Sequence, residues 1–175
     1  MTAPGFKPYM SYDLIVYGGE RKKGVYDYAD HDYFVTHGRY AIVGLNFNPI
    51  YHFNQYFGAG ASLDVQYDES ANIKDYIVED NEDTDKIRFY KPPFSRQLGV
   101  GISIRGELKM PFFTLNLGVG RNLFGRGDDL NKLYQIFAMK TFLSRCVFLH
   151  VGYQLYNFKD PNNLMLGIGY SFGAR

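Results

Sequence analysis

Hydrophobic and polar residues alternate along most of this 175-residue chain. The clearest stretch is residues 97–110, QLGVGISIRGELKM, where every even position is apolar or Gly and most odd positions are polar. A period of two over such a length predicts a β-strand with one apolar and one polar face. Residues 57–67 and 163–172 repeat the pattern, which favours an all-β fold.

Eight segments of this kind follow one another along the chain. The other five are 9–19, 33–48, 113–119, 130–143 and 147–155. The segment 130–143 is ambiguous, because Lys140 interrupts one face and Gln135 interrupts the other. We therefore expect eight strands, of which this one is the least certain from its pattern.

Long and short connections alternate between these segments. The long ones are expected near 20–32, 68–96, 122–130 and 157–162, and the others are short turns. An even number of strands with long loops at one end and short turns at the other is typical of a bacterial outer-membrane barrel. The pattern predicts an eight-stranded antiparallel up-and-down transmembrane β-barrel over residues 9–175, after an N-terminal segment 1–8.

A soluble ligand-binding β-barrel alternates in the same way, with its apolar face inward, and alternation alone does not tell which face is inside. Two features favour the membrane version. The polar face combines many Gly with Asp64, Gln66, Arg105 and Glu107, which suits a narrow lumen with a polar network between strands. The 16 Tyr and 15 Phe gather near strand ends, where aromatic girdles lie.

Composition narrows the function further. A net charge of +1 gives no reason to expect a nucleic-acid partner. One Cys excludes an internal disulfide, and the start MTAPGFKPYM has no apolar core, so no signal peptide is expected in this chain. We expect neither cofactor nor metal, because the spacing of His31, His37 and His52 matches no metal motif and suits surface positions, with His52 in a short turn.

The stretch HVGYQLYNFKDPNNLMLGIGYSF, residues 150–172, resembles the lipid A deacylase family, often labelled acyloxyacyl hydrolase. It contains a strand, a short loop with Pro161-Asn162 and a closing strand, and FGAGASLDVQYDES and LYQIFAMKTF are similar as well. The resemblance implies an outer-membrane barrel and an esterase that removes an acyl chain from lipid A, so lipopolysaccharide would be its lipid partner. It also implies a serine nucleophile, a histidine base two residues before it on the seventh strand, and a carboxylate on the preceding strand.

The catalytic pair of the family is not recognisable here. Aligned on the Pro-Asn pair, Gly152 takes the histidine position and Gln154 the serine position, while the carboxylate falls near Tyr134 or Gln135. A shift by two residues brings His150 to the base position, but then Gly152 stands where the nucleophile should be. His150 shares the polar face with Gly152 and Gln154, so we expect it in the lumen, whereas the site of the family works on the lipid-facing wall.

Three functions stay open at this point: an esterase with relocated residues, a non-catalytic structural or lipid-binding barrel, and a soluble ligand-binding barrel. A Ser-Asp-His arrangement across the lumen with His150 is an alternative to a purely structural polar network. The sequence does not specify an oligomeric state.

Overall fold

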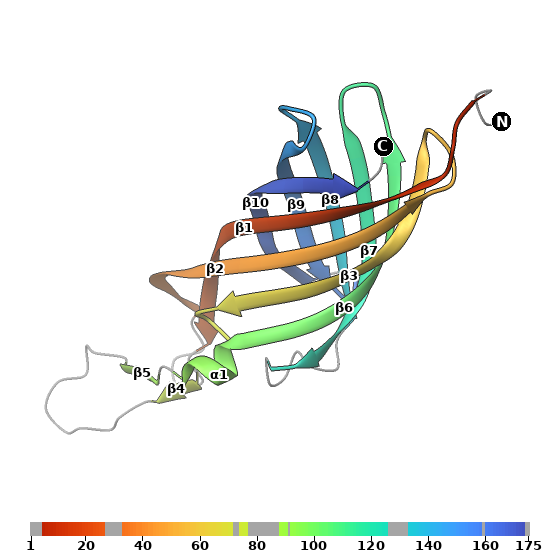
Figure 1. Cartoon of the computed structure of the whole chain (residues 1–175). Coiled ribbons are helices and arrows are strands. Elements are labelled where there is room, and N and C mark those ends of the chain that lie inside the picture. The colour runs from red at the N-terminus through yellow and green to blue at the C-terminus, as the bar shows by residue number, and fades with distance from the viewer. Residues whose placement is uncertain are drawn as a thin grey trace, which may run out of the picture.

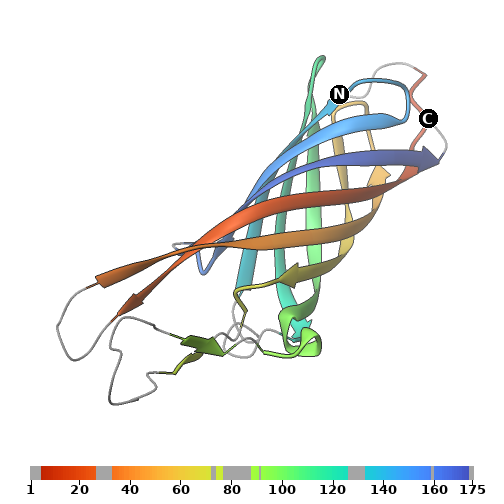
Figure 2. The same ribbon diagram turned by 90° about the vertical axis from the view of Figure 1, so that its left-hand side faces the viewer.

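The computed structural model describes residues 5–26, 33–71, 74–76, 88–90, 92–125, 133–158 and 160–173. Its barrel strands are β1 (Tyr9–Tyr26), β2 (Tyr33–His52), β3 (Phe57–Asp68), β6 (Leu98–Lys109), β7 (Thr114–Phe124), β8 (Leu133–Phe142), β9 (Val147–Tyr156) and β10 (Asp160–Gly173). They close in the order β1-β10-β9-β8-β7-β6-β3-β2, each antiparallel to its neighbours (Figures 1 and 2). This confirms the predicted eight-stranded up-and-down barrel.

The two ends of the barrel differ. Both termini and the turns 53–56, 110–113 and 143–146 lie at one end, which we call the terminal end (Figure 1). At the other, the loop end, β4 (Lys74–Tyr76) pairs with β5 (Arg88–Tyr90), and α1 (Phe94–Gln97) leads into β6. Within the described residues, no helix has the length and apolar character needed to cross a membrane.

Several strands continue further than the alternation suggests. Residues 20–26, which the sequence placed in a loop, belong to β1, because their backbone pairs with β2 as far as Tyr26 opposite Tyr33. Likewise, 122–124 belong to β7 and 160–162 to β10. Backbone hydrogen bonds between neighbouring strands set these ends, and they do not require that side chains alternate.

On most strands the apolar face points outward and the polar face points into the lumen, and the lumen also holds a cluster of apolar side chains that includes Ile15, Ile136 and Phe148. Ile104 is 76% exposed and Ile168 is 59% exposed, whereas Arg105 is 1% exposed and Glu107 is 5% exposed. An apolar wall around a polar interior is stable only where the wall faces hydrocarbon, and a closed barrel leaves no unpaired edge strand there. The chain is therefore an outer-membrane β-barrel, and the soluble alternative would leave this wall in water.

Large side chains in the lumen pack over glycines of the neighbouring strand. Phe148 of β9 is fully buried over Gly169 of β10, where an added Cβ would lie 2.1 Å from the phenyl ring. Tyr17 of β1 covers Gly44 of β2 in the same way, with 2.0 Å between that Cβ position and the ring. Pairing large with small residues is how a narrow barrel closes its interior.

Candidate functional site

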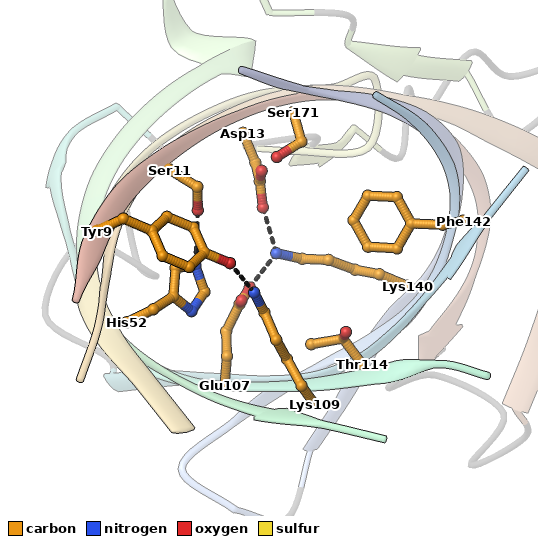
Figure 3. A pocket seen from close by; sticks show the side chains of 10 residues that line it. All are labelled: Tyr9, Ser11, Asp13, His52, Glu107, Lys109, Thr114, Lys140, Phe142 and Ser171. Atoms are coloured by element: carbon orange, nitrogen blue, oxygen red, sulfur yellow. Dashed lines mark hydrogen bonds and ion pairs between the residues drawn. The ribbon is translucent and has the colours of Figure 1, made fainter. Parts of the chain in front are cut away.

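A lysine crosses the lumen at the terminal end and contacts two carboxylates (Figure 3). The Nζ atom of Lys140, on β8, donates to Asp13 Oδ2 on β1 and to Glu107 Oε1 on β6, and all three residues are buried. The Nδ2 atom of Asn116, on β7, donates to the same Glu107 oxygen at 2.9 Å. These ion pairs join strands that are not neighbours in the barrel, in a medium where charge interactions are stronger than in water.

A serine and a histidine contact each other beside this cluster (Figure 3). The Oγ atom of Ser11 and the Nε2 atom of His52 lie 2.8 Å apart, and the His52 ring packs at 4.6 Å from the Tyr9 ring between centroids. The Nζ atom of Lys109 donates to the Tyr9 hydroxyl at 2.5 Å. The pair therefore sits among aromatic and cationic groups near the terminal mouth.

This Ser-His contact has the geometry of a nucleophile and its base, but the third group is missing. In a catalytic triad a carboxylate holds the other ring nitrogen. The Nδ1 atom of His52 is buried without a hydrogen-bond partner among the described residues, and it faces the backbone of Gly58. The cavity beside Ser11 and His52 measures about 20 Å³, which is room for about one water molecule and not for a lipid.

A second polar layer, closer to the loop end, is centred on Asp64. Its Oδ1 atom accepts from Arg105 Nη2 at 2.8 Å and from Ser62 Oγ at 2.5 Å. Its Oδ2 atom accepts from Ser103 Oγ at 2.8 Å and from Tyr134 Oη at 2.6 Å. Both serine hydroxyls of this layer thus donate to a carboxylate that also pairs with Arg105, and none of the hydrogen bonds of Asp64 described here involves a histidine.

The structure separates the other two lumen residues of interest from this layer. Gln66 lies further toward the loop end, where its Oε1 accepts from Tyr17 Oη at 3.3 Å and its Nε2 donates to Asn163 Oδ1 at 3.4 Å. Glu107 lies toward the terminal end with Lys140. Arg105 consequently pairs with Asp64 and not with Glu107.

The three β9 residues that the sequence comparison singled out, His150, Gly152 and Gln154, face the lumen. His150 is 1% exposed, Gln154 is 4% exposed, and Gly152 lies buried between them. Neither ring nitrogen of His150 has a hydrogen-bond partner within the described part of the chain, and the nearest ring contact is Tyr17 at 6.4 Å between centroids. The structure does not bring a serine or a carboxylate into hydrogen-bond contact with His150 in these residues.

Tyr134 and Gln135, the two residues near which we expected the carboxylate of the family, make different contacts. Tyr134 points inward and donates to Asp64, as described above. Gln135 lies on the outward side of β8, yet it is buried, because the turn after β9 folds over it. Its Oε1 accepts from the Phe158 backbone N–H at 2.8 Å and its Nε2 donates to Leu133 O at 3.4 Å.

Sequence reasoning did not single out Ser11, Asp13 or Lys109 of the terminal cluster, and it misplaced His52. The expectation of a surface turn for His52 is wrong, because β2 continues through it and its side chain is 1% exposed. His31 and the side chain of His37 lie outside the described residues. No group of three or more His, Cys, Asp or Glu side chains able to hold a metal occurs in the part of the chain that is described.

Comparison with solved structures finds other barrels at low identity. The attachment invasion locus protein Ail of Yersinia pestis, in complex with the heparin analogue sucrose octasulfate, is 16% identical over 94% of this chain and 99% of Ail, with a TM-score of 0.45. Ail in a phospholipid bilayer nanodisc is 18% identical over the same shares, with a TM-score of 0.48. The KdgM porin is 11% identical over 91% of this chain and 99% of that chain, with a TM-score of 0.37.

None of the curated proteins compared gives a significant match. In contrast, the model of the family described as acyloxyacyl hydrolase, C-terminal domain, matches residues 10–174, which is nearly the whole chain. This agrees with the resemblance carried by the seventh and closing strands. The chain therefore belongs to the acyloxyacyl hydrolase C-terminal domain family.

Proposed function

We propose that this barrel binds lipid A of lipopolysaccharide in the outer membrane and does not cleave it through the serine and histidine positions of its family. Family membership supports lipid A as the ligand. The observation that supports the absence of cleavage is that Gly152 and Gln154, which we expect at the catalytic positions from the alignment on Pro161-Asn162, are buried on the lumen side of β9. Neither residue supplies a nucleophile or a base for ester hydrolysis.

Access supports the same conclusion. A general base must reach the group that it deprotonates within hydrogen-bond distance, directly or through one water. The acyl esters of a membrane lipid lie outside the barrel wall, whereas His150 is 1% exposed on the inner side of that wall. A lipid bound to the wall would be separated from His150 by the backbone of β9.

A second candidate is an esterase that uses Ser11 and His52. The 2.8 Å contact between Ser11 Oγ and His52 Nε2 favours it, since this is the geometry that activates a serine. The location disfavours it for lipid A, because the pair lies in the lumen beside a cavity of about 20 Å³. We rank it below lipid binding for that reason.

One experiment separates these possibilities. Refolded protein is incubated with lipid A in vesicles, and mass spectrometry follows both the acyl pattern and the lipid A retained per barrel after extraction. We expect retained lipid A with an unchanged acyl pattern. Acyl loss that Ser11→Ala abolishes would establish the esterase that uses Ser11 and His52. Acyl loss that His150→Ala abolishes would establish ester hydrolysis on β9. Either result would refute the proposal of binding without cleavage.

A matched control comes from the same cavity. Ser171 and Ser11 are each 8% exposed, and both line the terminal cavity. Of the two, Ser11 is the one that contacts His52 (Figure 3). Ser171→Ala should leave any acyl loss intact. Absence of retained lipid A on the wild-type barrel would refute the proposed ligand.

A further inference from the structure

The outer wall is not evenly convex. Across β2, β3, β6, β7 and β8 it carries a groove of about 610 Å³, in the size range of ligand sites, which is roughly 300–1,000 Å³. Residues that line it include Phe47, Ala61, Leu63, Ile102, Ile104 and Arg121. Ala61 is paired with Ile104, so a short side chain lies beside long ones and lowers the wall at this point.

A second groove of about 460 Å³ adjoins the first. The two share Ile104 and Val119, which are paired across β6 and β7 and form a ridge between them. Gly106 lines the second groove, and an added Cβ there would meet no atom within 4 Å. The wall thus offers two adjoining, largely apolar grooves separated by one pair of side chains.

A cation lies at the loop-end side of the first groove. Arg121 is exposed on the outward side of β7, directly opposite Ile102 on one neighbour and Leu133 on the other. A guanidinium among apolar side chains suits a ligand that has both hydrocarbon and an anion. Phosphate is the anion whose geometry it matches best, through paired N–H donors.

The second groove is closed at the loop end by a strained turn. Asn157 has φ of 48° and Phe158 has φ of 61°, both in the left-handed region that non-glycine residues rarely adopt. The Gln135 side chain accepts from the Phe158 N–H, and Phe158 lines this groove. Positive φ at consecutive residues is what a tight turn between antiparallel strands requires, and the hydrogen bond to Gln135 fixes the Phe158 backbone at the edge of the groove.

We propose that these two grooves hold two acyl chains of lipid A and that Arg121 binds one of its phosphates. This inference rests on the proposed function, because it specifies where on the barrel the lipid lies. The ridge of Ile104 and Val119 separates the chains, and the strained turn limits how far the second chain extends toward the loop end. A second copy of the chain on this wall would need no phosphate and is one outcome of the test.

The test measures binding of lipid A to the refolded barrel by native mass spectrometry, with a bisphosphorylated and a dephosphorylated form as probes. Arg121→Gln should weaken binding of the bisphosphorylated form about tenfold, because it removes a charge-assisted contact. Arg121→Lys should weaken binding less, because it keeps the positive charge and loses only the paired N–H donors. The wild type should bind the dephosphorylated form about as weakly as Arg121→Gln does. Arg145→Gln is the matched control, since this exposed arginine lies in the turn at the terminal end.

The grooves are tested by filling them. Ala61→Phe and Gly106→Leu add side chains on the outward face, one in each groove, and each should weaken binding at least about tenfold. Ile168→Phe enlarges an exposed residue of β10 and should have no effect. Folding of every variant is checked by its heat-modifiable migration on gels, and two independent variants keep the test valid if one fails to fold.

The outcomes separate the site from the function. Lipid A binding by the wild type that none of these variants weakens would overturn the site and leave the proposed function standing. Lack of lipid A binding by the wild type would overturn the proposed function. It would overturn the site as well if phosphatidylglycerol does not bind either. Binding of phosphatidylglycerol that the same variants weaken would retain the site for another phosphorylated lipid. A lipid-independent dimer that Ala61→Phe disrupts would overturn the site in favour of a second copy of the chain.

Discussion

Replacing Lys140 by Met should destabilise the barrel by about 4 kcal/mol. The ammonium group is the shared partner of Asp13 and Glu107 at the terminal end of the lumen. Methionine has a similar length and fills the same space, so the change removes the charge with little loss of packing. Two carboxylates would then face each other inside the barrel without a cation between them.

The magnitude follows from burial. Removing one partner of a buried ion pair costs about 3–5 kcal/mol, because the other charge is left without compensation. Here Asp13 is 3% exposed and Glu107 is 5% exposed, so bulk water does not solvate either carboxylate, and the small cavity beside them has room for about one water molecule. The contact of Lys140 with the buried Phe148 ring, at 5.4 Å from Nζ to the centroid, adds up to about 2 kcal/mol, because both groups are desolvated.

The assay is urea unfolding of the barrel in vesicles, followed by far-UV circular dichroism because the chain has no Trp. Adding Asp13→Asn and Glu107→Gln to Lys140→Met should return the free energy of unfolding to within about 1 kcal/mol of the wild type, since no charge then stays unpaired. Lys109→Met, at a half-buried position in the same cavity, is the control and should cost about 1 kcal/mol or less. A loss below about 1 kcal/mol for Lys140→Met, or no recovery in the triple variant, would refute this account.

Three further changes test other parts of the barrel. Asp64→Asn should cost about 3 kcal/mol in the same urea assay, because Arg105 would stay buried without its anion. Gly169→Ala should cost about 1–3 kcal/mol, since the added methyl overlaps a buried ring, whereas Gly106→Ala should change stability by less than about 0.5 kcal/mol. Gln135→Leu should remove about 1 kcal/mol from the turn after β9, and faster hydrogen exchange or proteolysis of that turn, with the barrel intact, is the expected readout.

For the strands that alternate clearly, the sequence predicted which face is polar, and it also predicted the number of strands and their up-and-down order. It did so because side-chain direction in a strand has a period of two, so parity alone assigns a face. Even β8, the ambiguous strand, follows this rule. Its two interrupting residues are Lys140 inside the lumen and Gln135 outside it, and each is buried for a different reason.

The partners of the lumen residues were beyond sequence reasoning. Parity places Arg105, Asp64 and Glu107 on the inner face, but the axial level of each depends on the stagger between strands. That stagger pairs Gly60 with Arg105 and Asp64 with Gly101, which brings Asp64 and not Glu107 into contact with Arg105. Contacts across the lumen, such as that of Lys140, link strands that are not neighbours, and no local pattern encodes them.

The terminal cluster was missed for a related reason. The alternation in β2 weakens before its end, so the turn was expected to begin too early and His52 was assigned to the surface. Pairing of β2 with β3 continues to His52 opposite Gly58, and the absence of a side chain at Gly58 leaves room for the imidazole ring. The presence of Gly58 on the neighbouring strand was the one sequence feature that could have indicated a buried His52.

The bridge formed by Lys140 also has a consequence for permeability. An ion that moved through the barrel would have to pass between Asp13 and Glu107, and it would have to displace the ammonium group that both carboxylates hold. Planar-bilayer recordings should therefore show no steady conductance from the wild-type barrel. Neutralising all three groups removes the electrostatic barrier but not the side chains that fill the lumen, so the triple variant should stay electrically silent as well.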